Sequence, residues 1–213
     1  MITNLRTVLG ILLILGGVLL ALQQFGIIGG DFGDAVFTGL YALGAYYFYG
    51  LYRNSRNQWW FGFLALLLTG LTITNLLDIF VPSVGGVVGG GIFLGMLGLG
   101  FLIAYFRDRA SWWAIIPAGV MFSLALVAIV DDLPLTLPFE SGGILFLGMG
   151  ITFFILSFIR VGTERLTWAI FPAIVLAAFG LFVGFGEEAA WGYIWPALII
   201  LTGLYFLVSA IRR

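Results

Sequence analysis

The sequence predicts an all-α integral membrane protein with eight transmembrane helices, arranged as four tandem helical hairpins. Three observations support this: an apolar composition, regularly spaced apolar runs and an internal repeat. Of the 213 residues, 62% are hydrophobic and only 9% are charged, whereas soluble domains carry about a quarter charged residues. With a mean hydropathy of +1.16, the chain has too much apolar surface to hide from water. We therefore expect lipid to be its solvent.

Three residue types are missing, and their absence limits the chemistry. The chain has no Cys and no His, and all nine of its cations are Arg. Disulfides, thiolate nucleophiles, histidine bases and Cys or His metal sites are therefore excluded. We predict that the protein is not an enzyme and that it has no cofactor, no metal site and no nucleic-acid partner.

Eight apolar runs are long enough to cross a bilayer, and turn residues separate them. The first run resembles a signal peptide, but no small-residue cleavage site follows it, so we expect it to stay in the protein. The predicted helices cover about residues 7–27, 34–52, 59–80, 87–106, 111–130, 142–159, 166–185 and 191–211.

The charges define an orientation for this eight-helix arrangement. Every Arg falls on one side, and most Asp and Glu residues fall on the other. Basic loops stay in the cytoplasm, so both termini are predicted to be cytoplasmic, in a bacterial inner (plasma) membrane. Five Trp residues lie next to the basic loops and are expected to form an aromatic belt at headgroup level: Trp59, Trp60, Trp112, Trp113 and Trp168.

The even-numbered helices end in similar sequences, which reveals the repeat. YFYGLYR, FLIAYFR, FILSFIR and FLVSAIR close with Arg53, Arg107, Arg160 and Arg212, which are 54, 53 and 52 residues apart. The odd-numbered helices carry WWFGFLAL, WWAIIPAG and TWAIFPAI. We infer one membrane domain, residues 1–213, built from hairpins at 1–53, 54–107, 108–160 and 161–213. The units enter the membrane in the same sense, which predicts a compact bundle with pseudo-fourfold character.

Glycine and proline suggest how these helices pack. Most glycines are expected to let helix backbones approach closely. Two alternatives remain for the run from Gly85 to Gly91, which is either a flexible outer loop or a weak helix start. Pro117 and Pro172 lie near the starts of their helices, where each produces a structural bend or frees a carbonyl to line a cavity.

Polar residues form two candidate sites. At the level of the membrane midplane, candidate lining residues are Tyr46, Tyr47, Thr69, Ser123 and Thr202; hydroxyls there either line a pathway or bond to their own helix. At the outer surface lies a candidate polar cluster of Gln23, Gln24, Asn75, Asp78, Asp131 and Asp132. This cluster either attracts cations or consists of solvated loop and cap residues.

Two segments resemble a known family. VLGILLILGGVLLALQQFGII (residues 8–28) and WPALIILTGLYFL (195–207) resemble the LiaI/LiaF-like transmembrane region of bacterial envelope proteins. The hairpin repeat also resembles that of HdeD-like membrane proteins. Both resemblances imply a multi-spanning bacterial protein, and the LiaI/LiaF likeness implies a role in envelope stress.

These observations predict a non-enzymatic bacterial inner-membrane protein. It would be an accessory, structural or envelope-stress component acting through its helix surfaces and acidic outer loops. Its expected partners are membrane lipids and either another membrane protein or further copies of itself. The alternative is a channel or carrier for a small or lipophilic solute, with a pathway through the helix bundle.

Overall fold

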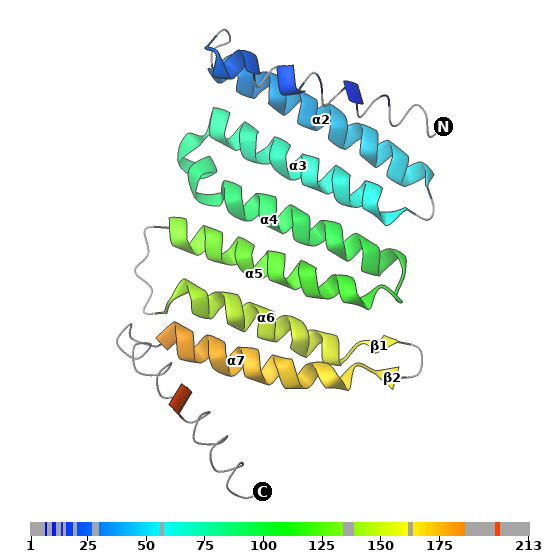
Figure 1. Cartoon of the computed structure of the whole chain (residues 1–213), viewed down its shortest axis with the longest axis vertical. Coiled ribbons are helices and arrows are strands. Elements are labelled where there is room, and N and C mark those ends of the chain that lie inside the picture. The colour runs from blue at the N-terminus through cyan, green and yellow to red at the C-terminus, as the bar shows by residue number, and fades with distance from the viewer. Residues whose placement is uncertain are drawn as a thin grey trace, which may run out of the picture.

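The structure, a computed structural model, consists of helices that run side by side in alternating directions (Figure 1). It describes residues 7, 10–11, 14, 16–18, 21–26, 30–55, 58–133, 139–161, 164–185 and 199–200. The α-helices are α2 (Gly30–Asn54), α3 (Trp59–Phe80), α4 (Pro82–Arg107), α5 (Ile115–Asp132), α6 (Ser141–Ser157) and α7 (Ile170–Phe185). Two short 3₁₀ helices, η1 (Trp112–Ala114) and η2 (Thr167–Ala169), precede α5 and α7.

Four helical segments are long and apolar enough to cross a membrane: α3, α4, η1 with α5, and η2 with α7. Helix α6 is apolar but has only 17 residues. Helix α2 has 25 residues, including several tyrosines, and is not among the four. The described part of the chain is therefore helical and suited to a membrane, as the composition predicts. The predicted eighth helix lies outside the described residues, apart from Ile199 and Ile200.

The glycine-rich start of α4 is helical, which corrects the predicted start at residue 87. Helix α4 begins at Pro82, a favourable first helical residue, and continues through every glycine from Gly85 to Gly91. Gly89 lies against Thr74 of α3, and Gly91 lies against Ile129 of α5. This run is therefore neither a loop nor a frayed end, because close packing on both sides holds it in a helix.

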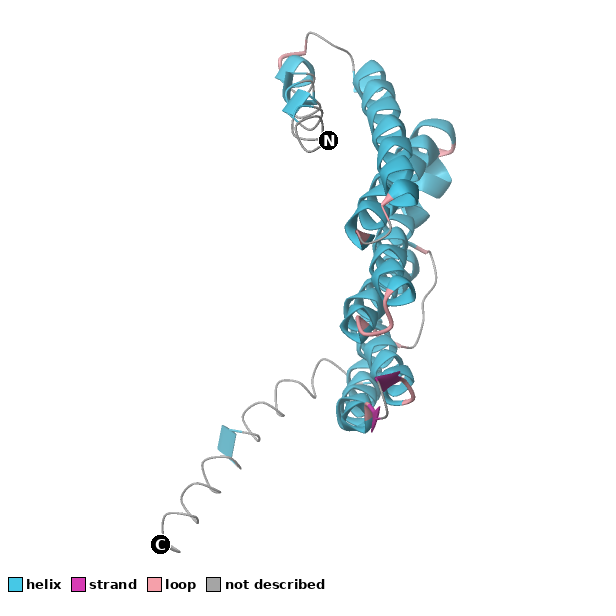
Figure 2. Ribbon diagram, turned by 90° about the vertical axis from the view of Figure 1, so that its right-hand side faces the viewer, coloured by secondary structure: helices cyan, strands magenta, loops and turns pink. Residues whose placement is uncertain are grey.

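The described helices form a single layer rather than the compact bundle that the repeat predicts. Extensive contacts join only chain neighbours, from α2 with α3 through to α6 with α7. Seen from the side, the layer is thin and slightly staggered (Figure 2). For this part of the chain, the prediction of a compact bundle is wrong. Lipid gives apolar faces no drive to close on one another, so a repeat of hairpins is not sufficient to close the helices into a bundle.

Glycines allow the tightest contacts between neighbouring helices. A Cβ added to Gly143 of α6 would lie 2.4 Å from Cα of Gly184 in α7. In α5 and α6, Gly119 lies under Thr152, and Gly148 lies under Ser123. The backbones can approach this closely only because these positions have no side chain.

The two segments with a Trp-Ala-Ile-Xaa-Pro pattern adopt the same local structure. In each, a 3₁₀ turn leads into an α-helix whose third residue is proline, Pro117 in α5 and Pro172 in α7. The related segment at Trp59 has no proline, and α3 starts there without a 3₁₀ turn. Proline has no N–H, so Pro117 and Pro172 cannot donate an α-helical hydrogen bond to the carbonyl four residues earlier, in Trp113 and Trp168. This explains the altered first turn in the two copies that contain it.

One end of the layer carries the arginines and tryptophans of the described helices. Helices α2 and α4 finish there with Arg53 and Arg107 in their last turns. The short strands β1 (Arg160–Val161) and β2 (Glu164–Arg165) join α6 to α7 at the same end (Figure 1). We refer to it as the basic end; the sequence did not predict its β-hairpin.

Candidate functional site

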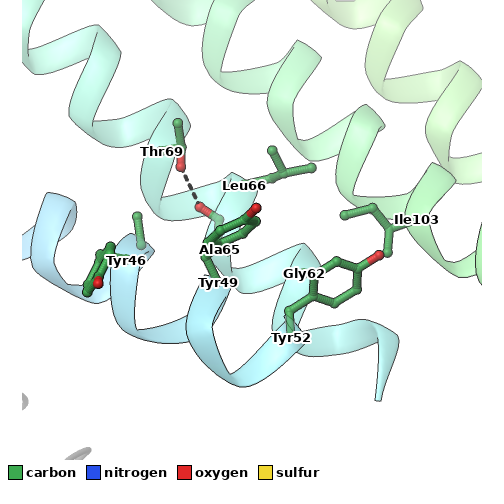
Figure 3. Close-up of a pocket in the computed structure, with 9 residues that line it drawn as sticks. Tyr46, Tyr49, Tyr52, Gly62, Ala65, Leu66, Thr69 and Ile103 are labelled. Carbon is green, nitrogen blue, oxygen red and sulfur yellow. Dashed lines mark hydrogen bonds between the residues drawn. The ribbon is translucent and has the colours of Figure 1, made fainter. Parts of the chain in front are cut away.

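The described residues of α2, α3 and α4 line a groove. It has a volume of about 310 Å³, and Figure 3 shows the residues that line it. We call it the tyrosine groove, because three of its lining residues are tyrosines. Its lining is Ala45, Tyr46, Tyr49 and Tyr52 from α2, Gly62, Ala65, Leu66 and Thr69 from α3, and Ile103 from α4.

The three tyrosines form one wall of the groove. They are spaced three residues apart, so they lie on one side of α2 at successive levels. Tyr46 is 79% exposed and Tyr49 is 51% exposed, whereas Tyr52 is partly buried. This wall therefore presents phenol rings and hydroxyls at the surface of the described residues.

The floor of the groove is apolar and comes mainly from α3. The Tyr52 ring lies so close to Gly62 that a Cβ there would be 2.9 Å from a ring carbon. The Thr69 hydroxyl donates to the Ala65 carbonyl at 2.7 Å, within its own helix (Figure 3). This hydroxyl therefore adds little polarity to the floor.

Cations lie beside the mouth of the groove at the basic end. The Arg107 guanidinium lies over the Tyr52 ring, 4.5 Å from its centroid, a distance typical of cation–π contacts. It also donates to the Ser55 carbonyl. Arg53 follows Tyr52 and is exposed at the end of α2. The groove thus runs from an apolar floor to a positively charged rim.

The structure separates the candidate midplane residues. Tyr46 and Thr69 share the tyrosine groove. Tyr47 does not line the groove; it packs beside Phe48 and Phe61, in an apolar cluster that shares Ala65 and Tyr52 with the groove lining. Ser123 is buried between α5 and α6, and its hydroxyl donates to the Gly119 carbonyl at 2.8 Å. Thr202 lies outside the described residues.

The candidate outer polar cluster is spread along the end of the layer opposite the basic end. Gln23 donates to Asp34 at 3.5 Å, and Gln24 is exposed. Asn75 donates to the Leu71 carbonyl of its own helix. Asp78, Asp131 and Asp132 are exposed, and within the described residues no three acidic groups gather as a metal site would require.

Sequence reasoning named Tyr46 and Thr69 but missed most of the groove. The spacing of Tyr46, Tyr49 and Tyr52 was a usable signal, because positions three apart share a helix face. The same rule places Tyr47 on a different face of α2. Ile103 could not be found in this way, because its place depends on how α4 packs against α3.

Comparisons of the chain with protein-family models, with curated proteins and with solved structures found no match.

Proposed function

We propose that this chain is a non-enzymatic membrane protein that works through its helix faces, as an accessory or structural component. The observation that carries the proposal is the single layer of helices (Figure 2). A layer has two broad faces. Large aliphatic and aromatic side chains are exposed on this layer. Such faces suit contacts with lipid and with other membrane helices.

The polar side chains inside the layer support the same proposal. Ser123 and Thr152 donate to carbonyls of their own helices at 2.8 Å. Thr74 donates to the Gly89 carbonyl across the α3–α4 contact at 3.1 Å. No buried side-chain nitrogen or oxygen among the described residues lacks a partner. The hydrogen-bonding capacity of these groups is therefore used within the protein, which leaves little of it for a solute.

The same proposal includes eight spans in four hairpins, with both termini in the cytoplasm of a bacterium. The alternating helix directions and the basic end support it, as do the matching 3₁₀ turns before α5 and α7. The resemblance to LiaI/LiaF-like segments adds envelope stress as the proposed setting.

Cross-linking in native membranes tests whether the helix faces meet a partner. Phe171 of α7 is 74% exposed, whereas Ala173, two residues later, is 4% exposed. Because the natural chain has no Cys, Phe171→Cys introduces a single thiol, and Ala173→Cys is the matched control. We expect oxidation to link the Phe171→Cys thiol to the thiol of a second copy or of a partner that has a Cys, as one discrete species, and to leave Ala173→Cys unlinked. A monomer in every membrane preparation, from single-Cys variants of all exposed faces, would contradict the proposal.

A carrier for a lipophilic solute is the second proposal, favoured by the placement of Tyr46 and Thr69 in one groove. It predicts solute flux in reconstituted vesicles that Ala45→Phe, which fills the groove, abolishes. The accessory proposal predicts no flux in either protein.

A further inference from the structure

We propose that the tyrosine groove binds one anionic phospholipid, with an alkyl chain along α3 and the phosphate at the basic end. This inference goes beyond the proposed function and requires only that the helices lie in a membrane. It rests on the shape of the groove, the levels of its tyrosines and the charge at its rim.

The groove is matched to an alkyl chain. Its floor presents Ala65, Leu66 and Ile103, and its volume of about 310 Å³ is at the lower end of the range for ligand sites. One alkyl chain fits such a space better than a complete lipid. The remaining chain and the headgroup would extend out of the groove.

The tyrosines suit the part of a lipid where its polarity changes. Each step of three residues along α2 rises about 4.5 Å, so Tyr46, Tyr49 and Tyr52 lie at three depths below the basic end. Phenol rings combine an apolar body with a hydroxyl that needs a partner when removed from water. A glycerophospholipid offers ester oxygens at these depths, whereas a simple hydrocarbon offers none. The exposure of Tyr46 and Tyr49 leaves their rings accessible to such a molecule.

The charge at the rim selects the headgroup. Arg53 comes seven residues after Tyr46 and four after Tyr49, so it continues the same face of α2. Arg107 lies over Tyr52, which lines the groove. A guanidinium has five N–H donors and suits phosphate geometry. An anionic phosphate is therefore complementary to this rim, and a neutral or zwitterionic headgroup is less so.

Native mass spectrometry of the full chain tests the site. The protein is released from micelles that contain equal amounts of phosphatidylglycerol and phosphatidylcholine with identical acyl chains. We expect one phosphatidylglycerol to be retained per chain in clear preference. Arg53→Gln should weaken that preference about fivefold, the effect of one basic residue near an anionic lipid. Arg160→Gln, at the same end but on β1, should leave it unchanged.

A second pair of variants tests the groove itself. Ala45→Phe fills the groove and should abolish retention, whereas Ala42→Phe, one turn away on an exposed position outside the lining, should not. Tyr46→Leu alters an exposed side chain without disturbing the helix contacts, and it should also weaken retention. If Ala45→Phe lowers the thermal midpoint in lipid-free micelles, its loss of lipid could reflect poor folding, and Tyr46→Leu then decides the test.

Several results would overturn the proposal. Equal retention of the two lipids would show that the rim does not select charge. Retention unaffected by both Ala45→Phe and Tyr46→Leu would place the lipid elsewhere. A Tyr46→Cys variant that forms a disulfide-linked homodimer in native membranes would assign the groove to a second copy. None of these results depends on the Phe171→Cys experiment, so the two proposals can fail separately.

Discussion

At the scale of single residues, the absence of a side chain matters most in this protein. Lipid provides no hydrophobic drive between helices, so dispersion contact and close backbone approach must hold them together. Gly143, which faces the backbone of α7, shows the need most clearly. Gly95, in α4, has open space where its Cβ would be. The two positions therefore separate glycine that is required from glycine that is incidental.

We predict that Gly143→Ala destabilises the protein and that Gly95→Ala does not. At Gly143 the new methyl would meet the Gly180 carbonyl oxygen at 2.7 Å, and backbone cannot move aside as a flexible side chain can. The expected cost is about 1–3 kcal/mol, the usual range for overpacking. Gly95→Ala should be neutral or up to about 1 kcal/mol stabilising, through helix propensity. Thermal midpoints in one detergent compare the variants, and equal values for both would refute this account of Gly143.

At the scale of elements, α5 and α6 interlock through two reciprocal contacts. The Ser123 side chain of α5 lies over Gly148, and the Thr152 side chain of α6 lies over Gly119. Each hydroxyl donates to the carbonyl of the glycine four residues earlier in its own helix. Each helix thus offers one glycine and one hydroxyl residue to its antiparallel neighbour, which fixes the register of the pair.

This interlock predicts coupling between Gly148 and Ser123. Gly148→Ala would place a Cβ 2.2 Å from the Ser123 oxygen, so we expect it to destabilise the protein by about 1–3 kcal/mol. Ser123→Ala alone should cost under about 1 kcal/mol, because a helix carbonyl keeps its backbone bond when the hydroxyl is lost. The double variant should lose less unfolding free energy than the two single variants lose in total. Strict additivity in the thermal midpoints would argue against the contact.

The odd-numbered helices also touch one another at the basic end, through tryptophans. The Trp59 and Trp113 rings meet edge to face at 6.0 Å between centroids, and Trp112 and Trp168 do so at 6.1 Å. These rings bridge helices that are not neighbours in the layer. The expected aromatic belt therefore also joins successive segments of the chain.

A double-mutant cycle on Trp112 and Trp168 tests this bridge. Edge-to-face pairs contribute about 0.5–1.5 kcal/mol beyond the burial of their area, and we expect a coupling energy in that range. The pair Trp59 and Trp168, for which no ring contact is found among the described residues, is the control and should give additive effects. The measurement for each cycle is the unfolding free energy in mixed micelles of the unmodified protein, the two single variants and the double variant.

At the scale of the whole molecule, the helices run in alternating directions, so the described Arg residues collect at one end, where Asp108 and Glu164 also lie, and the other described acidic residues collect at the opposite end. Arg53, Arg107, Arg109, Arg160 and Arg165 belong to the basic end, and Asp34, Asp78, Asp131, Asp132 and Glu140 belong to the other. Basic residues favour the cytoplasmic side. The layer as a whole therefore carries its own signal for orientation in the membrane.

Single-Cys labelling tests that orientation on a chain with no native Cys. Asn54→Cys and Ala110→Cys lie at exposed positions of the basic end, and Ser83→Cys and Asp132→Cys lie at exposed positions of the other. An impermeant thiol reagent should reach the first pair only in inside-out vesicles and the second pair only in intact cells. Labelling of Asn54→Cys and Ala110→Cys from opposite sides would contradict the alternating arrangement.

Much of the helical layout could be read from the sequence, and the groove mostly could not. The predicted helix at 59–80 matches α3, because Trp59 and Pro82 mark its limits clearly. The start of α4 was placed too late, since glycine has poor helix propensity and only contacts with α3 and α5 reveal why it is helical there. Tyr46 was named as a lining residue without its partners Tyr49 and Tyr52.

Composition and the spacing of apolar runs are sufficient to determine that this chain forms helices suited to lipid. The reason is that backbone groups in a bilayer must bond within their own segment, so each run folds as a helix whatever surrounds it. The choice of a single layer over a closed bundle, and the groove between α2, α3 and α4, came from packing alone. Those features depend on which glycines and side chains of different helices are in contact. The apolar pattern within one helix contains no information about these interhelical contacts.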